Sequence, residues 1–234
     1  MATPTTAVFE QPKPRRRLPL WARILVWIVR LALLFLVIQL LRNPWPVLHN
    51  RMFPALLLWV VFFVYWAIEG RNSAPDKRAE SKRSTYFHAL LLNSALVLLF
   101  WPAPGLKGWF LPQGLPHHVA AGTIIQGAFM VLAIWARRRL GRNWSGAVRI
   151  AEGHELVRTG PYRWLRHPIY TAMLGMFVGT AIASGQYHTL LGLILLIIAY
   201  LRKTRLEEQI LQQTFGADFD AYRRRTWALV PLVF

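Results

Sequence analysis

Two short polar segments hold the side chains of this sequence that are best suited to chemistry. Residues 154–170 read HELVRTGPYRWLRHPIY and combine histidine, carboxylate, arginine and aromatic side chains. Residues 202–209 read RKTRLEEQ and place two adjacent carboxylates beside three cations. Such groups bind charged ligands or move protons, but they also occur as ordinary solvated charges. The elements that position the two segments decide between these interpretations.

The first segment contains the start of a helix. His167 is followed by Pro168, and proline suits the first helical position because its φ is fixed and its missing N–H is not needed there. Arg166 and His167 are therefore predicted at the N-terminal end of that helix, where free amides and the helix dipole attract a carboxylate or a phosphate. Tyr162 and Trp164 suit an adenine pocket and an aromatic belt at a membrane surface equally well.

A helical hairpin is predicted between the two polar segments. Residues 168–201 are apolar throughout and are interrupted only at Ser184-Gly185-Gln186. Its arms, about 17 and 15 residues, are short for full membrane spans, so we expect them to be tilted or sheltered by other helices. A hairpin returns the chain to the face where it began, and it therefore brings residues 202–209 back towards His167.

Composition places this hairpin in a membrane protein. Of the 234 residues, 55% are hydrophobic and only 16% are charged, whereas soluble domains carry roughly 25% charged residues. The hydrophobicity excludes a disordered chain, and the absence of Cys excludes a disulfide scaffold. The formal charge of +18 suggests either a nucleic-acid partner or basic flanks of membrane helices.

The positions of the charges favour the membrane. Candidate spans cover residues 20–41, 52–68, 86–102, 118–135 and the two hairpin arms, which predicts an all-α integral membrane protein with about six transmembrane helices. If these helices alternate in direction, 23 of the 28 basic residues and all ten acidic residues fall on one side. The positive-inside rule then predicts a multi-pass protein with both termini and the segment 137–168 in the cytoplasm. We expect no nucleic-acid partner.

The first half of the chain carries little chemistry. Arg30 lies near the middle of the first span, where it needs a partner or a wet groove, and Asn93 suits a hydrogen bond between helices. His117 and His118 are adjacent, so on a helix they do not face one another, and we expect no metal site.

The ordered pattern LVRTGPYRWLRHPIY, a hydrophobic hairpin, EE and FGADFDAYRRRTWALVP resembles the isoprenylcysteine carboxyl methyltransferase and phospholipid methyltransferase superfamily. The resemblance covers residues 137–231. It implies a pocket for S-adenosylmethionine at the cytoplasmic face of the C-terminal half, connected to the lipid by a tunnel. We accordingly divide the chain into a flexible basic tail (1–19), N-terminal transmembrane helices (20–136) and a C-terminal cofactor-binding catalytic region (137–234).

The resemblance also implies site residues. The residues that match cofactor-binding positions are His154, Glu155, Leu156, Val157, Tyr162, His167, Pro168, Ile169, Tyr170 and Glu208. An arginine that faces the substrate in the eukaryotic carboxyl methyltransferases is replaced here by Thr204, so we assign its role to the neighbouring Arg205, with Arg202 as the alternative. Glu207 is the second catalytic candidate. A glutamine that contacts the cofactor in those enzymes is replaced here by Ala147.

The resemblance implies a membrane methyltransferase that acts on a lipophilic acceptor. Methyl transfer from a sulfonium is an in-line displacement, which requires alignment and desolvation. A carboxylate acceptor needs no base, as in isoprenylcysteine carboxyl O-methylation. An amine or a thiol, as in phospholipid N-methylation or thiol S-methylation, must lose a proton to a base such as Glu207 or His167. No strong base constellation is visible, which favours an acceptor that is already ionised.

Two alternatives belong to other functional classes. A small transporter or non-catalytic membrane protein would need polar residues near the middle of several helices, and few are present. A membrane reductase related to the sterol reductases would bind a nicotinamide cofactor instead of S-adenosylmethionine. A soluble methyltransferase is not expected, because the sequence has no glycine-rich turn of the Rossmann type.

Overall fold

The part of the chain described by the structure, a computed structural model, starts at residue 51. It comprises residues 51–69, 76–79, 82–100, 105, 108–111, 116–141, 144, 149–151 and 156–231. All of them belong to one compact unit, Asn50–Phe234. The predicted span 20–41 and the predicted basic tail 1–19 lie outside the described residues, as do Arg30 and Ala147. The functional division at residues 136 and 137 stays a prediction.

Three apolar helices precede the first polar segment of the sequence. They are α3 (Phe53–Glu69), α4 (Lys82–Phe100) and α5 (Pro116–Leu140). The predictions of helices at 52–68, 86–102 and 118–135 are confirmed, with shifts of a few residues at the ends. Helix α5 begins at a proline and stops before Gly141, whose φ of 53° is a conformation that favours glycine.

The predicted hairpin is formed by α6 (Pro168–Ser184) and α7 (Tyr187–Phe215). Between them, Gly185 adopts a φ of 67° and donates its N–H to the carbonyl of Ala181, which closes the last turn of α6. Helix α7 does not stop where its apolar stretch ends. It continues through the second polar segment as far as Phe215, so the two adjacent carboxylates are part of the hairpin arm itself.

Short elements complete the fold. The 3₁₀ helix η3 (Gly160–Arg163) precedes α6, and α8 (Ala217–Arg223) follows α7. Strands β1 (Asp76–Ala79) and β2 (Arg149–Ala151) form one antiparallel pair, with Arg78 opposite Ile150. The expectation of an all-α protein therefore needs one correction. The sequence DKRA of β1 has no alternating apolar pattern, so its strand was not predictable from periodicity.

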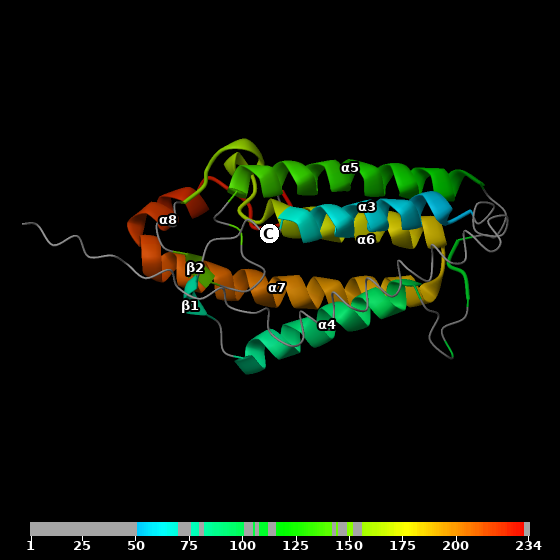
Figure 1. Cartoon of the computed structure of the whole chain (residues 1–234), viewed down its shortest axis with the longest axis horizontal. Helices are drawn as coiled ribbons and strands as arrows, with labels where there is room; N and C mark the ends of the chain where they lie inside the picture. The colour runs from blue at the N-terminus through cyan, green and yellow to red at the C-terminus, as the bar shows by residue number, and fades with distance from the viewer. Residues whose placement is uncertain are drawn as a thin grey trace, which may run out of the picture. The chain divides into compact units, whose positions relative to one another are not determined.

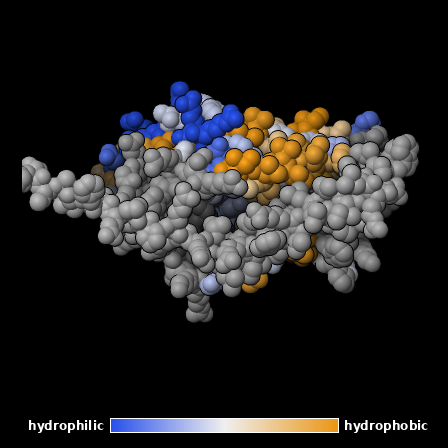
Figure 2. All heavy atoms as spheres, viewed as in Figure 1, coloured by the Kyte–Doolittle hydropathy of each residue, from blue (hydrophilic) through white to orange (hydrophobic). Residues whose placement is uncertain are grey.

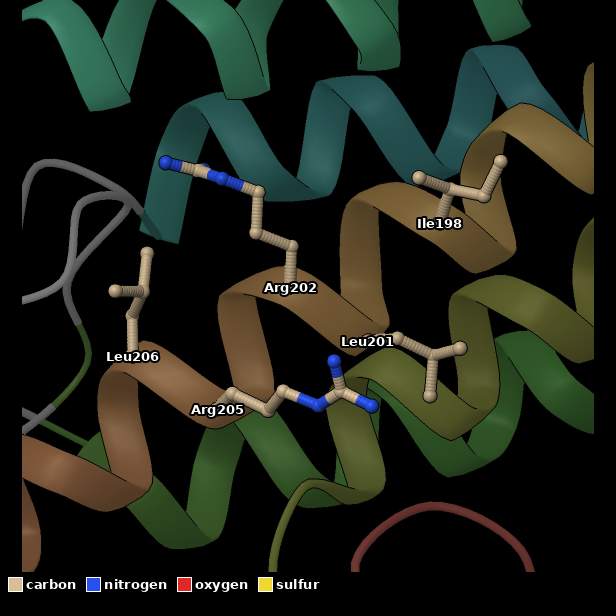
Figure 3. A pocket seen from close by; sticks show the side chains of 5 residues that line it. All are labelled: Ile198, Leu201, Arg202, Arg205 and Leu206. Carbon is tan, nitrogen blue, oxygen red and sulfur yellow. The ribbon is translucent and has the colours of Figure 1, made fainter.

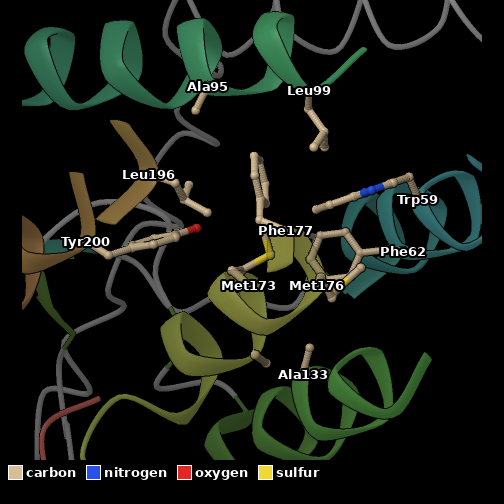
Figure 4. Packing of buried hydrophobic residues seen from close by; sticks show 11 residues of the cluster. Trp59, Phe62, Ala95, Leu99, Ala133, Met173, Met176, Phe177, Leu196 and Tyr200 are labelled. Carbon is tan, nitrogen blue, oxygen red and sulfur yellow. The ribbon is translucent and has the colours of Figure 1, made fainter. Parts of the chain in front are cut away.

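The helices pack in two pairs, α5 against α6 and α4 against α7, and α3 also contacts α5 (Figure 1). The α5–α6 crossing is close because glycines meet there: a Cβ added to Gly179 would lie 2.6 Å from the Gly122 carbonyl oxygen. Phe177 of α6 lies at the centre of the core, with Leu99 of α4 on one side and Trp59 of α3 on another (Figure 4). The Trp59 indole also donates to the Thr180 hydroxyl at 2.9 Å.

Much of the helix surface is apolar. Ile124 and Val131 of α5 are 71% and 64% exposed, and large exposed apolar side chains also lie on α3, α4 and α7. Figure 2 shows apolar side chains over the middle of α3 and α5, with hydrophilic ones gathered at the end where α8 and η3 lie. Residues 117–140 form the one described helix that is long and apolar enough to cross a bilayer, and residues 53–69, 86–99 and 168–184 form shorter apolar helices.

Candidate active site

Four of the predicted site residues meet at the start of α6. His167 is the residue that precedes the first turn of α6, and its ring lies between the two carboxylates of α7. The distance from His167 Nδ1 to Glu207 Oε2 is 3.3 Å, and from His167 Nε2 to Glu208 Oε1 it is also 3.3 Å. The second approach is a charge contact rather than an aligned hydrogen bond, because the buried Nε2 has no hydrogen-bond partner among the described residues.

Tyr170 fixes the other carboxylate oxygen of this group. Its hydroxyl donates to Glu207 Oε1 at 2.5 Å, and its ring stacks on the His167 ring at 5.5 Å and on the Tyr200 ring at 4.7 Å. The Lys203 ammonium lies 5.3 Å from the centre of the Tyr170 ring, and Lys203 stands between the apolar arm and Glu207 in the sequence. Glu207 is therefore surrounded by groups that stabilise its negative charge.

Arg166 holds Glu208 in place. Its Nε donates to Glu208 Oε1 at 2.6 Å, and both side chains are largely buried. The Nη1 of the same guanidinium donates to the carbonyls of Thr226 and Arg223, the latter at 3.2 Å. Arg166 thus connects a carboxylate of α7 to the chain that follows α8.

We call Arg166, His167, Tyr170, Glu207 and Glu208 the His167 cluster. The charges of its members shift one another's pKa values. Burial alone would lower the pKa of His167, but its contacts with Glu207 and Glu208 outweigh burial and raise it. Burial would raise the carboxyl pKa values, yet His167, Lys203 and Tyr170 lower the pKa of Glu207. His167 and Arg166 likewise lower the pKa of Glu208 to about 2. The cluster thus favours a protonated imidazole together with two ionised carboxylates.

The remaining predicted cofactor residues have different surroundings. Pro168 and Ile169 are buried in the first turn of α6, and the Tyr162 side chain packs with Ile169 in a small core next to the end of α5. Val157 packs against the same small core, and Leu156 lies beside it in sequence, half-buried. His154 and Glu155 lie outside the described residues. Tyr162 therefore contributes its ring to packing, and its carbonyl accepts a hydrogen bond from Tyr222 at 2.6 Å.

Arg205 lies away from the cluster. It lines a pocket of about 370 Å³ on the surface of α7 together with Ile198, Leu201, Arg202 and Leu206. Figure 3 shows the Arg205 side chain extending along α7 toward Leu201. Arg202 donates to the Ser84 hydroxyl of α4, whereas Arg205 is exposed. The structure thus places both candidate arginines at one pocket, and it places Glu207 on a different face of the same helix.

Sequence reasoning missed several residues of the site. Lys203 and Thr204 are buried on the side of α7 that carries Glu207 and Glu208, and Arg166 was assigned to a helix end without a partner. The signal for Lys203 was its spacing of four residues before Glu207, which places both on one helix face. No sequence signal identifies the contact between Arg166 and the carbonyls after α8, because main-chain acceptors carry no side-chain pattern.

This arrangement suits binding of a ligand that carries both charges. Two half-buried carboxylates are acceptors for a cationic group, while His167 and Arg166 are donors for an anionic one. On the face shown in Figure 2, hydrophilic side chains gather at the end where η3 and α8 lie, and η3 directly precedes the start of α6 where the cluster lies. The pocket at Arg205 combines apolar walls with guanidinium groups, which suits an amphiphile with an anionic head.

A protein-family comparison matches the same part of the chain. The family described as "Phospholipid methyltransferase" matches residues 117–218, from α5 to the start of α8. All four residues of the His167–Tyr170–Glu207–Glu208 group lie within this match.

Individual relatives are more distant. The chain is 28% identical over 149 residues to the probable protein-S-isoprenylcysteine O-methyltransferase of Oryza sativa subsp. indica, covering 62% of this chain and 73% of the relative. It is 28% identical over 196 residues to protein-S-isoprenylcysteine O-methyltransferase A of Arabidopsis thaliana, covering 78% of this chain and 94% of the relative. A solved structure of the eukaryotic intramembrane Ras methyltransferase aligns with a TM-score of 0.48 and 16% identity, covering 92% of this chain and 87% of that one.

Proposed function

We propose that this chain belongs to the isoprenylcysteine carboxyl methyltransferase and phospholipid methyltransferase superfamily, and that it transfers a methyl group from S-adenosylmethionine to a lipophilic carboxylate. Its similarity to protein-S-isoprenylcysteine O-methyltransferases supports a membrane methyltransferase of this type. The cofactor assignment rests on the His167–Glu207–Glu208 contacts. A histidine at the start of α6 meets two carboxylates of α7, so the two arms of the hairpin contribute to one site.

The residues of this group fit the cofactor. S-Adenosylmethionine supplies an electrophilic methyl group on a sulfonium, and it carries an ammonium and a carboxylate as well. Glu208 and Glu207 offer acceptors for its cationic groups, and the His167 Nε2, which is buried without a hydrogen-bond partner in the described region, offers a donor. Leu156, Val157, Pro168 and Ile169 would supply apolar contacts around them. His154 and Glu155 are proposed to extend the same site.

The protonation states favour an acceptor that is already ionised. Glu207 is a weak base, because its charged form is stabilised by Tyr170, Lys203 and His167. The two carboxylates raise the pKa of His167, which favours the protonated form of its ring. Neither group is then ready to take a proton from an amine or a thiol. A carboxylate acceptor requires no such step, so O-methylation fits this site better than N- or S-methylation.

The pocket at Arg205 is proposed as the acceptor side of the site. Its apolar lining of Ile198, Leu201 and Leu206 suits a hydrocarbon chain, and the guanidinium of Arg205 suits the carboxylate. Because the pocket is lined mainly by apolar side chains while the carboxylates belong to a polar cluster, an acceptor would enter from the lipid and the cofactor from the aqueous side. We propose a multi-pass arrangement in which the polar end faces the cytoplasm.

Calorimetry on the detergent-purified protein tests the cofactor assignment. We expect S-adenosylhomocysteine to bind with micromolar affinity and to lose at least about tenfold in affinity in Glu208→Gln and His167→Gln, since each removes a buried charge partner. Asp218→Asn is the matched control, because Asp218 is an exposed carboxylate of α8. Failure to bind S-adenosylhomocysteine, together with binding of NADPH, would contradict the proposal and favour a reductase.

The chemistry of the acceptor is tested by methyl transfer from tritiated S-adenosylmethionine into extracted membrane lipids and into a prenylated N-acetylcysteine. A methyl ester releases volatile tritiated methanol on mild alkaline treatment, whereas an N-methyl or S-methyl product does not. Alkali-labile label in the prenylated compound supports carboxyl methylation. Alkali-stable label in the phosphatidylethanolamine fraction would favour phospholipid N-methylation instead.

A further inference from the structure

A segment of four residues after α8, Thr226–Leu229, which we call the C-terminal strap, runs beside the chain that leads into α6. The Trp227 N–H donates to the Trp164 carbonyl at 3.0 Å, and Leu165 and Trp227 form a parallel β-bridge. Ala228 and Leu229 are buried. The strap follows the part of the chain that the family comparison matches, which ends at residue 218.

The strap binds the main chain of Arg166 and His167, whose side chains both belong to the cluster. The Arg166 N–H donates to the Trp227 carbonyl at 2.8 Å, and the His167 N–H donates to the Ala228 carbonyl at 3.1 Å. Both N–H groups precede α6 and have no helical carbonyl to bind. The strap therefore satisfies them, and in doing so it fixes the direction in which the two side chains leave the backbone.

The strap also holds the Arg166 side chain and the first turn of α6. The Thr226 carbonyl accepts from the Arg166 guanidinium, which in turn binds Glu208. The Thr171 hydroxyl donates to the Leu229 carbonyl at 2.6 Å. A continuous path of hydrogen bonds thus runs from the strap through Arg166 to Glu208, and Glu208 faces His167.

We propose that the C-terminal strap positions His167 and Glu208 for ligand binding, with Trp227 and Thr171 as positioning residues that do not contact the ligand. The inference rests on the proposed function, because it names these two residues as part of the cofactor site. Hydrogen bonds depend strongly on distance and angle, so a small displacement of the His167 or Glu208 side chain lowers the affinity for the ligand markedly. Loosening the strap should therefore weaken cofactor binding without removing any group that touches the cofactor.

Two variants loosen the strap while leaving His167, Arg166 and both glutamates in place. Thr171→Val removes the hydrogen bond to the Leu229 carbonyl at 2.6 Å and the longer one to the His167 carbonyl at 3.3 Å. Trp227→Pro removes the N–H that binds Trp164 and leaves the contacts of the Thr171 hydroxyl in place. Thr180→Val is the matched control: it lies on the same helix, nine residues further along, and removes the hydrogen bond with Trp59 in the core. We expect S-adenosylhomocysteine affinity to fall about tenfold in the strap variants and to stay unchanged in the control, with comparable thermal stability in Thr171→Val and Thr180→Val.

A second measurement separates this inference from the proposed function. The His167 ring is followed by NMR of ¹³C-labelled histidine in lipid nanodiscs, and its signal is assigned by its loss in His167→Gln. The charged groups around the ring are Glu207, Glu208 and Arg166, with Lys203 beyond Glu207. Because the strap variants lengthen the contact with Glu208, the titration midpoint of His167 should fall towards the ordinary value of about 6.5.

The outcomes are distinct. A lowered midpoint in the strap variants without S-adenosylhomocysteine binding by the unaltered chain would support the strap as a positioning element and contradict the cofactor assignment. Normal binding by the unaltered chain, with the same affinity in both strap variants, would overturn the strap inference whatever the midpoint. Equal loss of affinity in Thr180→Val would also overturn it, because general destabilisation would then explain the effect.

Discussion

The ring of His167 lies between two carboxylates, directly before the first turn of α6. Its ring contacts Glu207 and Glu208, and Tyr170 stacks on its face. These contacts stabilise the protonated ring and the ionised carboxylates together. The group is therefore organised to bind charge rather than to abstract protons, which is the property that a displacement by an ionised acceptor requires.

The opposite pKa shifts of this group predict how stability depends on pH. The pKa of His167 is raised, so its contribution is complete below its unfolded pKa of about 6.5 and is lost as the pH rises through its folded value. The pKa of Glu208 is lowered from 4.5 to about 2. Its contribution to the free energy of unfolding is therefore complete above about pH 4.5 and is lost as the pH falls through its folded value of about 2. Thermal unfolding in detergent should show that His167 and Glu208 together stabilise the protein most between about pH 4.5 and 6.5.

The control for this prediction is His167→Gln. It should remove the loss of stability above neutral pH, because the glutamine has no proton to release there. A variant that keeps the same alkaline dependence as the unaltered chain would show that another group is responsible.

If the pocket at Arg205 binds the methyl acceptor, a change in the pocket should affect the acceptor and leave cofactor binding unchanged. Leu201→Trp fills the pocket with a larger side chain on the apolar wall. We expect the KM for a prenylated N-acetylcysteine to rise at least about tenfold, while S-adenosylhomocysteine affinity stays within about twofold. Leu191→Trp, at an exposed position on α7 further from the carboxylates, is the control. Equal effects on both substrates would show that the pocket and the cluster are not separate.

At the scale of residues, the sequence predicted the cluster better than the pocket. His167, Tyr170, Glu207 and Glu208 meet because a hairpin returns the chain to its starting face, and the break at Gly185 is visible in the sequence. The separation of Arg205 from Glu207 follows from helix geometry. Each residue turns the helix by about 100°, so two residues turn it by about 200°, towards a different face. The predicted end of the apolar arm at 201 left this geometry undefined.

At the scale of elements, the crossing of α5 and α6 positions the start of α6. Gly175 and Gly179 allow the two helices to approach, and a Cβ on Gly175 would lie 2.1 Å from the Phe129 ring. A Cβ on Gly179 would lie 2.6 Å from both the Gln126 nitrogen and the Gly122 carbonyl oxygen, which are backbone atoms that cannot rotate away. The helices meet through small residues, as in many membrane helix pairs.

This crossing predicts different outcomes for two glycine substitutions. Gly179→Ala should destabilise the protein by about 1–3 kcal/mol, because the added methyl forces the helices apart. Gly127→Ala on α5 should be neutral or stabilising by up to about 1 kcal/mol, because the nearest atom to its Cβ is Leu58 Cδ1 at 3.8 Å and alanine favours a helix. Thermal unfolding in detergent measures both. Similar destabilisation in the two variants would contradict the role of close contact at Gly179.

The elements themselves were predictable to different degrees. Apolar runs and prolines indicated α3, α5 and α6 to within a few residues, because hydropathy and a fixed proline φ act locally. The length of α7 was not predicted. Hydropathy marks where a helix leaves the lipid, whereas residues 202–215 contain many strong helix formers and no glycine until Gly216. The strap and the β1–β2 pair depend on main-chain contacts between distant segments, for which the sequence gives no local signal.

At the scale of the molecule, polar and apolar surfaces are separated along the helices. The His167 cluster lies at one end of α6, and the hairpin turn at Gly185 lies at its other end, where its carbonyl accepts from the Phe110 N–H at 2.8 Å. The turn and residues 108–111 thus lie together, away from the cluster (Figure 1). Between these ends, α5 exposes Ile124 and Val131, as a helix in contact with lipid would.

Because the chain contains no cysteine, single cysteines can report its membrane orientation without background labelling. We expect Asp218→Cys, at the polar end, to react with an impermeant maleimide in inside-out vesicles and Trp109→Cys to react in right-side-out vesicles. Both parent side chains are exposed. Labelling of both from the same side would contradict the proposed multi-pass orientation. The unaltered chain, which should not react, is the control.

Helix α7 joins the lipid region to the cluster without interruption. Its 29 residues span about 43 Å, longer than the roughly 30 Å of bilayer hydrocarbon. A single alanine inserted between Leu206 and Glu207 would rotate both carboxylates by about 100° away from His167 while leaving every existing side chain and the net charge unchanged. The rotation of α7 about its own axis therefore matters to the site as much as the side chains do. Substitutions along the exposed apolar surface of this helix should be tolerated, whereas insertions should not.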